Sequence, residues 1–299
     1  MISIIIPTLN ASEPLPSLLT KLEHQTCVDK EIIIIDSSSD DDTVEIAKSY
    51  GARVLHINRK DFDHGGTRNI AASKSKGDIL VFMTQDAIPA NEHSLENLIH
   101  PFESDEMIAA IYGRQLPSRD ATPFSSHLRL FNYPDTSHVK RYEDRTTHGF
   151  KTIFISNSFS AYRKALLEKI GWFKDNLIFG EDTHAVARLL HDGYKVAYAA
   201  NALVYHSHNY TPFQDFKRYF DIGVFHFNEN WIVQKFGKTK EEGWKYIKSE
   251  SLYLMKNKQY RLFPELILRN ILKYLSYNLG LRYTKIPRNI ARKISMHMK

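Results

Sequence analysis

Cysteine is nearly absent from this chain of 299 residues, in which Cys27 stands alone. A single cysteine excludes an intramolecular disulfide framework and a cysteine-rich metal site, and it fits a reducing compartment. Long apolar runs are also missing, since the best candidate, residues 262–281, is interrupted by Glu265, Arg269 and Lys273. The sequence therefore predicts no membrane-spanning helix.

The N-terminus lacks the basic region and the small-residue cleavage site of a secretory signal peptide. It begins Met1-Ile-Ser-Ile-Ile-Ile-Pro7, which is typical of a buried first strand. Hydrophobic residues make up 42% of the chain and charged residues 25%, which is the composition of an ordered globular protein. We therefore expect a folded cytoplasmic protein.

Acidic residues are scarce in the last part of the chain. Residues 213–299 contain 18 Lys and Arg against 7 Asp and Glu, a net charge of +11, whereas residues 1–212 contain 22 against 27, a net charge of −5. Beyond Thr211 the pattern is wholly helical and rich in aromatic residues and lysine. We therefore expect a first domain over residues 1–212 and a basic helical region over residues 213–299 that packs on it.

The first half of the chain alternates short β-branched runs with helical patterns. Because the runs are continuously apolar, we expect strands buried on both faces, in a mostly parallel sheet with helices on each side. The expected strands here are Ile2–Ile6, Ile32–Ile35, Arg53–Ile57 and Ile79–Thr84, and the expected helices are Pro14–His24, Thr43–Tyr50 and Thr67–Lys74. Further on, helices are expected at Leu95–Phe102, Phe124–Phe131 and Arg163–Ile170, and strands at Ile108–Tyr112, Thr152–Ile155 and Val196–Ala199.

Polar residues follow the first two expected strands. Pro7, Thr8 and Asn10 come after the first, and Asp36 and Ser38 come after the second. Because ligands of parallel sheets bind at the carboxyl ends of the strands, a nucleoside could lie here. Aspartate and serine are also ordinary turn residues, so turn chemistry is a sufficient explanation of either loop taken singly.

The third strand is followed by a loop with two glycines, Phe62-Asp-His-Gly-Gly-Thr-Arg-Asn69, and then by a helix. Gly65 would let the backbone approach a ligand closely, and Thr67 is a suitable N-cap. A helix start presents free N–H groups to an anion, and His64 and Arg68 could add charge-assisted hydrogen bonds to a diphosphate. The alternative is a turn with a surface arginine.

Carboxylates and a histidine complete the candidate site residues. Asp86 follows the fourth strand and is a suitable ligand for Mg²⁺ or Mn²⁺, or else it caps the next loop. Glu181 and Asp182 open a later helix, where they could be favourable partners of the helix dipole or supply a general base. His206 follows a strand-like run and could ligate a metal, although a lone histidine is more often a packing or surface residue.

Taken in order, these loops resemble those of the family-2 inverting glycosyltransferases, which have the GT-A fold. The resemblance covers about residues 1–230 and depends on Ile4–Asn10, Asp36–Asp40, Thr84-Gln85-Asp86, Gly171-Trp-Phe173 and Gly180-Glu181-Asp182. It implies an α/β fold with a Rossmann-like, mostly parallel sheet flanked by helices and a C-terminal helical extension. Residues 62–69 and 85–87 resemble more particularly bacterial rhamnosyltransferases, which use dTDP-L-rhamnose to build O-antigen or capsular polysaccharide.

The resemblance also implies a role for each motif. The implied donor-binding positions are Pro7, Thr8, Asn10, Asp36, Ser38, His64, Gly65, Arg68, Asn69 and Gln85. Among these, Asp36 would hydrogen-bond the pyrimidine. Asp86 would hold the divalent cation, with His206 as a further ligand. Asp182 would be the catalytic base, with Glu181 positioning the acceptor.

The implied reaction is a single in-line displacement. Asp182 would take the proton of an acceptor hydroxyl, which attacks the anomeric carbon opposite the departing dTDP and inverts its configuration. The cation on Asp86 and the Gly65-Gly66-Arg68 corner would stabilise the charge of the leaving group. Thr84 stands where the family usually has the first carboxylate of an Asp-x-Asp motif, which leaves a thinner metal shell for His206 and the donor phosphates to complete.

The basic tail suggests contact with an anionic membrane. Ile286, Ile290 and Ile294 recur on one side of a helix, and residues 262–281 are apolar almost all round, which is typical of a core or interface helix. Basic amphipathic helices suit the cytoplasmic leaflet, where an enzyme with a lipid-linked glycan acceptor would benefit from lying. Alternatively, these helices pack on the first domain or on a second subunit in a homo-oligomer.

Other functions fit part of the sequence. A sugar nucleotidyltransferase shares the architecture, but its glycine-rich, lysine-containing signature is absent after the first strand. A nucleic-acid-binding protein could use the basic tail, but no recognised module is present and residues 1–212 are acidic. A transferase that uses a UDP-sugar is the nearer alternative. We therefore expect a metal-dependent glycosyltransferase at the inner face of the cytoplasmic membrane that binds no nucleic acid.

Overall fold

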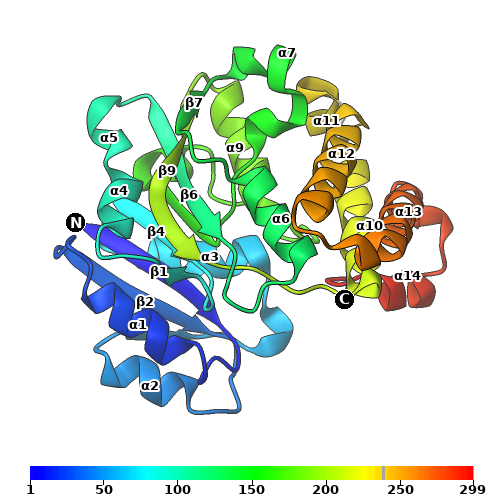
Figure 1. The fold of residues 1–299 in the computed structure, drawn as a ribbon. Coiled ribbons are helices and arrows are strands. Elements are labelled where there is room, and N and C mark those ends of the chain that lie inside the picture. Colours follow the sequence, from blue (N-terminus) through cyan, green and yellow to red (C-terminus); the bar gives the residue numbers. More distant parts are fainter. Residues whose placement is uncertain (238–239, 299) are drawn as a thin grey trace.

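One mixed sheet with helices on both faces forms the body of the protein (Figure 1). The computed structural model describes residues 1–237 and 240–298. The strand order is β3-β2-β1-β4-β8-β6-β9-β5, and β7 pairs with β9. The strands are β1 (Ile2–Thr8), β2 (Lys30–Asp36), β3 (Arg53–His56), β4 (Ile79–Met83), β5 (Ile88–Pro89), β6 (Ile108–Leu116), β7 (His138–Lys140), β8 (Phe159–Arg163) and β9 (Lys195–Tyr205).

Helices follow most of the strands and then form the tail. In the first part of the chain they are α1 (Leu15–Glu23), α2 (Thr43–Ser49), α3 (His64–Ser73), α4 (Ser94–Ile99), α5 (Pro101–Ser104), α6 (Pro123–Asn132), α7 (Arg145–His148), α8 (Lys164–Lys169) and α9 (Glu181–His191). In the tail they are α10 (Pro212–Asn228), α11 (Asn230–Phe236), α12 (Lys240–Lys256), α13 (Phe263–Gly280) and α14 (Arg288–Ile294). The helical tail is thus as expected.

Alternate residues of β1 belong to two apolar cores, one on each face of the sheet. Ile4 and Ile6 pack with residues of α1, α2, α4 and α5. Ile5 packs with residues of α3, α8 and α9 on the opposite face. Because both faces are covered, the strand is apolar without alternation, and its polar neighbours at the carboxyl end are left to form a site.

The sheet is parallel in one half and mixed in the other. Strands β3, β2, β1 and β4 run parallel, as their continuously apolar sequences predict. Strand β8 is antiparallel to both β4 and β6, while β6 is parallel to β9. The expectation of a mostly parallel sheet therefore holds for the first four strands of the chain and not for the remainder.

The expected strand at Thr152–Ile155 is wrong. Residues Gly149–Ile153 form a 3₁₀ helix, and the strand that enters the sheet is β8 instead. A short apolar run cannot distinguish a strand from a buried helical turn. Strand β8 was not predicted because it contains polar residues. The buried Ser160 hydroxyl donates to the Asn157 side chain, and the Arg163 guanidinium donates to backbone carbonyl oxygens, so both residues are accommodated in the sheet.

The first tail helices share the core of the sheet. Thr211 caps α10 by accepting from the Gln214 amide N–H, and the Gln214 side chain accepts from the Thr211 N–H. Phe225 of α10, together with Ile232 and Phe236 of α11, belongs to the core that also contains Ile5. The core is therefore continuous across residue 212, and the division of the chain at that residue remains a prediction.

Helices α10 and α13 cross with their backbones in contact. A Cβ atom added to Gly280 would lie 2.1 Å from the Phe220 carbonyl oxygen, and one added to Gly223 would lie 2.3 Å from the Tyr277 carbonyl oxygen. Glycine is therefore required at both positions of the crossing.

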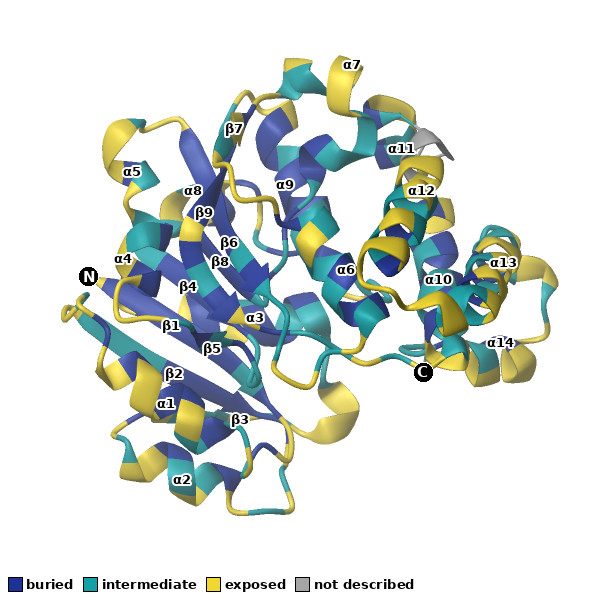
Figure 2. Cartoon of the chain, viewed as in Figure 1, coloured by how far each residue is buried: buried dark blue, intermediate teal, exposed yellow. Residues whose placement is uncertain are grey.

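Helix α13 turns its charged residues inward and its apolar residues outward. Arg269 and Lys273 are buried, and Ser276 is fully buried. The Arg269 Nη1 atom lies 2.6 Å and the Lys273 Nζ atom 3.8 Å from the Asp215 carboxylate of α10. The exposed residues of α13 include Ile267, Leu268, Ile271, Tyr274, Leu275 and Leu279 (Figure 2). Among the described helices, none is both long enough and apolar enough to cross a bilayer.

Candidate active site

The loops after β1 and β2 are tied to each other beneath the surface. The buried Asp36 carboxylate accepts hydrogen bonds from the Thr8 hydroxyl and from the backbone N–H and hydroxyl of Ser39. Pro7 lies within β1 and is partly buried. Thr8 and Asp36 therefore shape the loops from below, with their polar atoms already engaged.

Two exposed residues of these loops adopt left-handed backbone conformations. Asn10 has φ 48° and Ser38 has φ 61°. The Asn10 side-chain oxygen accepts from the Asp40 N–H, and the Ser38 hydroxyl donates to the Ile57 carbonyl. Such conformations are strained for residues other than glycine and cluster at functional sites. The Gln85 side chain exchanges two hydrogen bonds with the Leu9 backbone, which joins the loop after β4 to this pair.

Helix α3 begins earlier than expected, and Thr67 is not its N-cap. Asp63 is the N-cap, because its carboxylate accepts from the Gly66 N–H at 2.6 Å. In return, the Asp63 N–H donates to the Thr67 hydroxyl at 3.1 Å. Aspartate is at least as favourable as threonine at the N-cap position, where its carboxylate accepts from the backbone N–H three residues later. The Gly66 N–H, which was expected to face an anion, is therefore already bonded within the loop.

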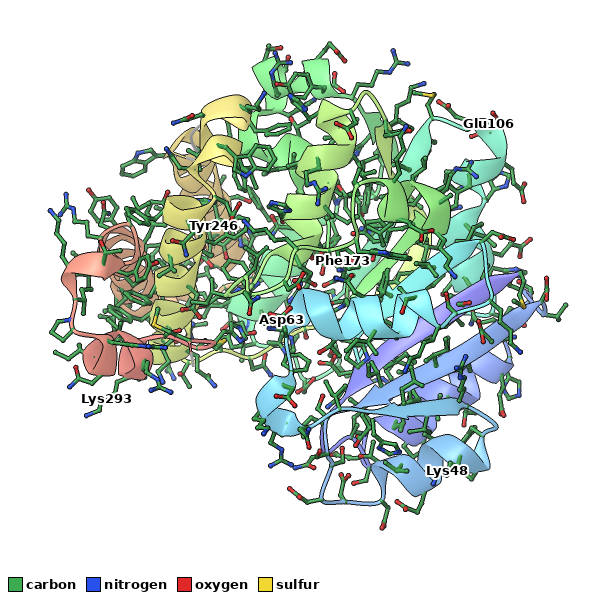
Figure 3. The ribbon with its side chains drawn as sticks, turned by 180° about the vertical axis from the view of Figure 1, so that it is seen from behind. Lys48, Asp63, Glu106, Phe173, Tyr246 and Lys293 are labelled. Carbon is green, nitrogen blue, oxygen red and sulfur yellow. The ribbon has the colours of Figure 1, made fainter. Side chains whose placement is uncertain are left out.

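The first turns of α3 also hold the segment that follows α8. A Cβ atom on Gly65 would lie 2.4 Å from the Lys174 carbonyl oxygen. The Asn69 side chain exchanges hydrogen bonds with the backbone N–H and C=O of Phe173, and Asp63 accepts from the Asn176 N–H (Figure 3). Gly65 and Asn69 thus position this segment, which is a different use from the donor contact that was expected.

Glu181 is locked into a buried ion pair. Its carboxylate lies 3.2 Å from the Arg68 guanidinium and accepts from the Asn157 side-chain amide at 3.0 Å. Arg68 also donates to the His64 carbonyl at 2.8 Å. Burial alone would raise the pKa of Glu181, but Arg68, His64 and Asn157 outweigh it and lower that pKa. Glu181 therefore stays ionised.

Asp182 is in the opposite electrostatic situation. It is half-buried in the first turn of α9 and accepts from the backbone N–H groups of Thr183 and Asn157. Burial, together with the neighbouring Glu181 charge, raises the pKa of Asp182 to about 7. A carboxylate with a pKa near the working pH is suited to general base catalysis.

The turn at Gly180, which precedes these carboxylates, packs against helix α10 of the tail. Gly180 has φ 80°, and a Cβ atom there would lie 3.2 Å from the Phe225 ring of α10. Glycine is required because the backbone is left-handed and the ring is close.

Three side chains form a candidate metal site at the ends of β4 and β9. Atoms of Asp86, His206 and His208 that can bind a metal all lie within 4.8 Å of one another. The His206 Nε2 atom lies 3.5 Å from the Asp86 carboxylate, and the His208 Nδ1 atom lies 3.8 Å from it. Burial would raise the pKa of Asp86, but the two imidazoles outweigh it and hold that pKa well below its usual range.

The histidine tautomer fits a metal ligand. The Arg129 guanidinium donates to the Gln115 side-chain oxygen at 2.6 Å, and the His206 Nδ1 lies 2.9 Å from that oxygen. With Gln115 as the acceptor, His206 bonds through Nδ1, and its buried Nε2 atom faces the Asp86 carboxylate at 3.5 Å without a hydrogen-bond partner. The site thus has a potential ligand atom that is buried and has no hydrogen-bond partner.

Gln115 connects the metal cluster to the candidate base. Its oxygen faces His206, and its amide nitrogen donates to the Ser156 hydroxyl at 3.2 Å. The next residue, Asn157, donates its backbone N–H to Asp182 at 3.1 Å. The adjacent residues Ser156 and Asn157 therefore bond to Gln115 on one side and to Asp182 on the other, which links His206 to the candidate base.

The sequence alone missed three of these residues. His208 had a signal, because it lies two positions after His206 in an extended segment, where alternate side chains share a side. Gln115 and Asn157 had none, since their roles depend on contacts with residues far away in the chain. Thr84 carries a buried hydroxyl beside Asp86, at the position of the missing carboxylate, and His208 supplies the third metal-binding group.

Comparison with known proteins identifies the family. Residues 3–171, more than half of the chain, match the model of Glycosyl transferase family 2. The chain is a family-2 glycosyltransferase. This glycosyltransferase is 44% identical over 298 residues to the O-antigen chain rhamnosyltransferase RfbN of Salmonella typhimurium strain LT2, with 99% of this chain and 94% of the relative covered. It is 43% identical over 297 residues to the O-antigen chain rhamnosyltransferase WbaN of Salmonella anatum, with the same shares covered.

Solved structures show that this glycosyltransferase has the predicted GT-A fold. The mannosyltransferase PcManGT from Pyrobaculum calidifontis, in complex with GDP-Man and Mn²⁺, matches with a TM-score of 0.63 at 13% identity, covering 94% of this chain and 86% of that one. Residues 1–349 of TarS from S. aureus match with a TM-score of 0.56 at 16% identity, covering 95% and 91%. At these identities the likeness establishes the fold alone.

Proposed function

We propose that this glycosyltransferase transfers L-rhamnose from dTDP-L-rhamnose to a hydroxyl of a growing, lipid-linked O-antigen glycan, with inversion at the anomeric carbon. The donor and acceptor classes are supported by the likeness to RfbN and WbaN over nearly the full length of both chains. Group transfer is supported chiefly by one observation: a carboxylate of raised pKa, Asp182, and the Asp86–His206–His208 cluster are held in one site, linked by Gln115 and the adjacent residues Ser156 and Asn157.

Asp182 is the proposed catalytic base. A general base must take the proton of the acceptor hydroxyl. Its carboxylate must therefore be accessible to the acceptor and have a pKa that allows it to bind a proton near neutral pH. Asp182 is half-buried with a raised pKa, whereas Glu181 is buried, ion-paired with Arg68 and permanently charged. Glu181 then acts indirectly, because its charge keeps the pKa of Asp182 near 7 and its pairing with Asn157 fixes the residue that bonds to Asp182.

The loop contacts divide the donor-binding residues into two groups. Asn10 and Ser38 are exposed and face the solvent at the strand ends, so we assign them direct contact with the nucleoside. Asp36 is buried with its carboxylate bonded to Thr8 and Ser39, so we assign it an indirect role, in place of the pyrimidine hydrogen bond first expected. Gly65 and Asn69 likewise act through the loop that they hold.

Of the two cations expected from the sequence, Mn²⁺ fits the cluster better than Mg²⁺. Mg²⁺ prefers oxygen ligands, while imidazole suits transition metals, and two of the three side chains here are histidines. When bound, the cation would neutralise charge on the donor diphosphate as the leaving group departs. Gln115 would fix the orientation of His206, and Asp86 would supply the negative charge.

A nucleotide panel tests donor and cation together. The melting temperature of the full chain would be measured with dTDP, UDP and GDP, each with Mn²⁺, with Mg²⁺ and with a chelator. Specific stabilisation by dTDP with Mn²⁺ is expected. A larger shift with UDP would replace the proposed donor by a UDP-sugar, and equal shifts with and without metal would refute the proposed cation role.

We further propose that the enzyme binds the anionic inner surface of the cytoplasmic membrane through the outer side of α13. Ile267 is 59%, Ile271 51% and Tyr274 69% exposed, and no charged residue lies among them on that side. Lys258 and Arg261 precede the helix, and Arg282 and Lys285 follow it, and all four are exposed. An apolar side with cations at both ends suits an interfacial helix on anionic lipid.

The same charges disfavour a homodimer through this side of α13. Two copies of α13 packed in either direction would bring cationic ends together, because both ends are basic. Like charges across an interface oppose association. An anionic lipid surface instead attracts both ends.

Vesicle binding tests the membrane proposal. The full chain should sediment with vesicles that contain phosphatidylglycerol and much less with pure phosphatidylcholine. The double substitution Ile271→Glu and Leu275→Glu should abolish sedimentation, whereas Val28→Glu, at an 84% exposed position on the β1–β2 side, should not change it. Retained binding by the α13 variant would remove this surface from the proposal.

A further inference from the structure

The last residues of the described chain are fastened to α10. The Asp221 carboxylate, which is fully buried, accepts from the Ser295 hydroxyl and from the backbone N–H groups of Met296 and His297, at 2.5, 2.9 and 3.0 Å. Met298 packs in the apolar cluster formed by α10 and α14. Residues 295–298 are therefore held in a single conformation, although they follow the last helix of the chain.

This fastening places His297 against the candidate donor loop. The His297 ring lies 5.1 Å from the His64 ring, edge to face at 86°. Burial, together with nearby His64 and Arg218, lowers the pKa of His297 to about 4, although Glu181 acts in the opposite direction. The ring is thus neutral at pH 7 and keeps one N–H that can donate to an anion. The tail thus brings His297 to the candidate donor loop, although His64 precedes it by 233 positions in the sequence.

Arg218 of α10 is close to both His297 and the metal cluster, and its charge contributes to lowering the pKa of His297 and of His208. The Tyr210 ring stacks on His208 at 5.3 Å, and the Arg218 guanidinium lies 5.8 Å from the centroid of the Tyr210 ring. Within residues 1–237 and 240–298, no carboxylate forms an ion pair with Arg218, although the residue is only half-exposed. The nearby Asp221 carboxylate acts on Arg218 electrostatically, but it already accepts hydrogen bonds from residues 295–297 and forms no ion pair with the guanidinium. A partly buried guanidinium that lacks a directly bonded anion is a favourable place for one to bind.

We propose that Arg218 and His297 bind the diphosphate of the nucleotide donor, in the space between the Asp86–His206–His208 cluster and His64. This inference rests on the proposed function, since it takes the donor to be a nucleoside diphosphate sugar. The tail then supplies two anion-binding groups that the GT-A sheet lacks, because Arg68 is paired with Glu181 and the Gly66 N–H is capped by Asp63. Charge develops on the departing diphosphate during transfer. Preorganised hydrogen-bond donors and positive charges at that position give the strongest electrostatic stabilisation of the transition state.

Isothermal titration of the full chain with dTDP and dTMP, both in Mn²⁺, separates a phosphate contact from a general loss of structure. Charge-assisted hydrogen bonds contribute enough that Arg218→Ala should weaken dTDP binding by about 10–100-fold. Because His297 is a neutral hydrogen-bond donor, His297→Ala should weaken dTDP binding by only about 3–10-fold. Binding of dTMP should fall much less, so that the preference for dTDP over dTMP shrinks in both variants. His297→Asn, which keeps a side-chain N–H, should retain part of the preference for dTDP over dTMP that His297→Ala loses.

Two substitutions at exposed positions serve as matched controls. Arg288→Ala removes a cation of the same tail, and His100→Ala removes an exposed imidazole beside Glu103. Both should leave the dTDP-to-dTMP preference at the wild-type value. If Arg218→Ala and His297→Ala lose affinity equally for dTDP and dTMP, or lose none, the inference is overturned. If the wild-type chain binds neither dTDP nor UDP, the proposed function itself fails.

Discussion

Strand β1 and helix α13 bury opposite kinds of side chain. In β1, Ile4, Ile5 and Ile6 are completely buried between layers of helices. In α13 the buried residues include Arg269 and Lys273, while large apolar residues face outward. The sheet is held by apolar burial, whereas α13 is held by charge-assisted bonds to α10 and by backbone contact at the helix crossing. Apolar surface that the fold does not use for its own stability is available for contact with something else.

The two regions also divide the work of the enzyme. The first turn of α9 and the loops after β4 and β9 present the proposed base and metal ligands, and the tail presents the proposed membrane contact and two groups for the diphosphate. Substitutions in the first region should therefore change the rate or the metal affinity, and substitutions in the packing of the second should change stability. Four experiments can break or sharpen this contrast.

The largest effect is expected for Asp182→Asn. Positioned acid–base groups contribute about 10²–10⁴-fold to rate, so kcat should fall by that factor while the melting temperature stays close to that of the wild type. Release of dTDP from dTDP-rhamnose in the presence of acceptor measures the rate. Asp192→Asn, at the exposed end of the same helix α9, is the control. Near-wild-type transfer by the Asp182 variant would mean that another group is the base.

The next effect is expected for Gln115→Leu, which removes the acceptor that orients His206. Loss of such an outer partner costs about 10–100-fold in metal affinity, which titration with Mn²⁺ would measure. Gln25→Leu is the control, because Gln25 is a similarly buried glutamine that bonds to backbone groups near α1 and α4. Unchanged Mn²⁺ affinity in the Gln115 variant would remove His206 from the metal site.

A smaller effect is expected at the crossing of α10 and α13. In Gly280→Ala the new methyl group would overlap the Phe220 carbonyl, so the free energy of unfolding should drop by about 1–3 kcal/mol. Gly243→Ala in α12 meets nothing within 4 Å and should raise the same quantity by up to about 1 kcal/mol, because alanine favours helix. Urea denaturation measures both. Equal stability of the two variants would contradict the close crossing.

The smallest effect is a shift of the pH profile. The base acts when deprotonated, so kcat/KM should rise with pH through the Asp182 pKa of about 7 and then level off. The Glu181 charge raises that pKa, so Glu181→Gln should move the acidic limb to lower pH, with Arg68 left to act in the same direction. A limb that stays in place or moves upward would show that Glu181 does not control the titration of Asp182.

The sequence predicted the parts of the molecule that local patterns determine. The strands β1, β2 and β4 and the candidate ligand Asp86 follow from continuous apolar runs and the polar residues after them. The N-cap at Asp63 was missed because aspartate and threonine are both favourable N-cap residues, and Thr67 lies only four positions after Asp63. Strand β8 was missed because its buried polar side chains are satisfied by partners distant in sequence. The inward charges of α13 could not be predicted, since they depend on Asp215 across a helix interface.

The left-handed turn at Gly180 has a consequence for exchanging the tail of this enzyme. Because Gly180 rests against Phe225, the turn that leads into Asp182 has been shaped jointly with α10. A chimaera that joins this catalytic half to the tail of another transferase would have to keep both partners of that contact. Helix α10 therefore supports the catalytic turn directly, so that replacing the tail would disturb the position of Asp182 as well as the tail itself.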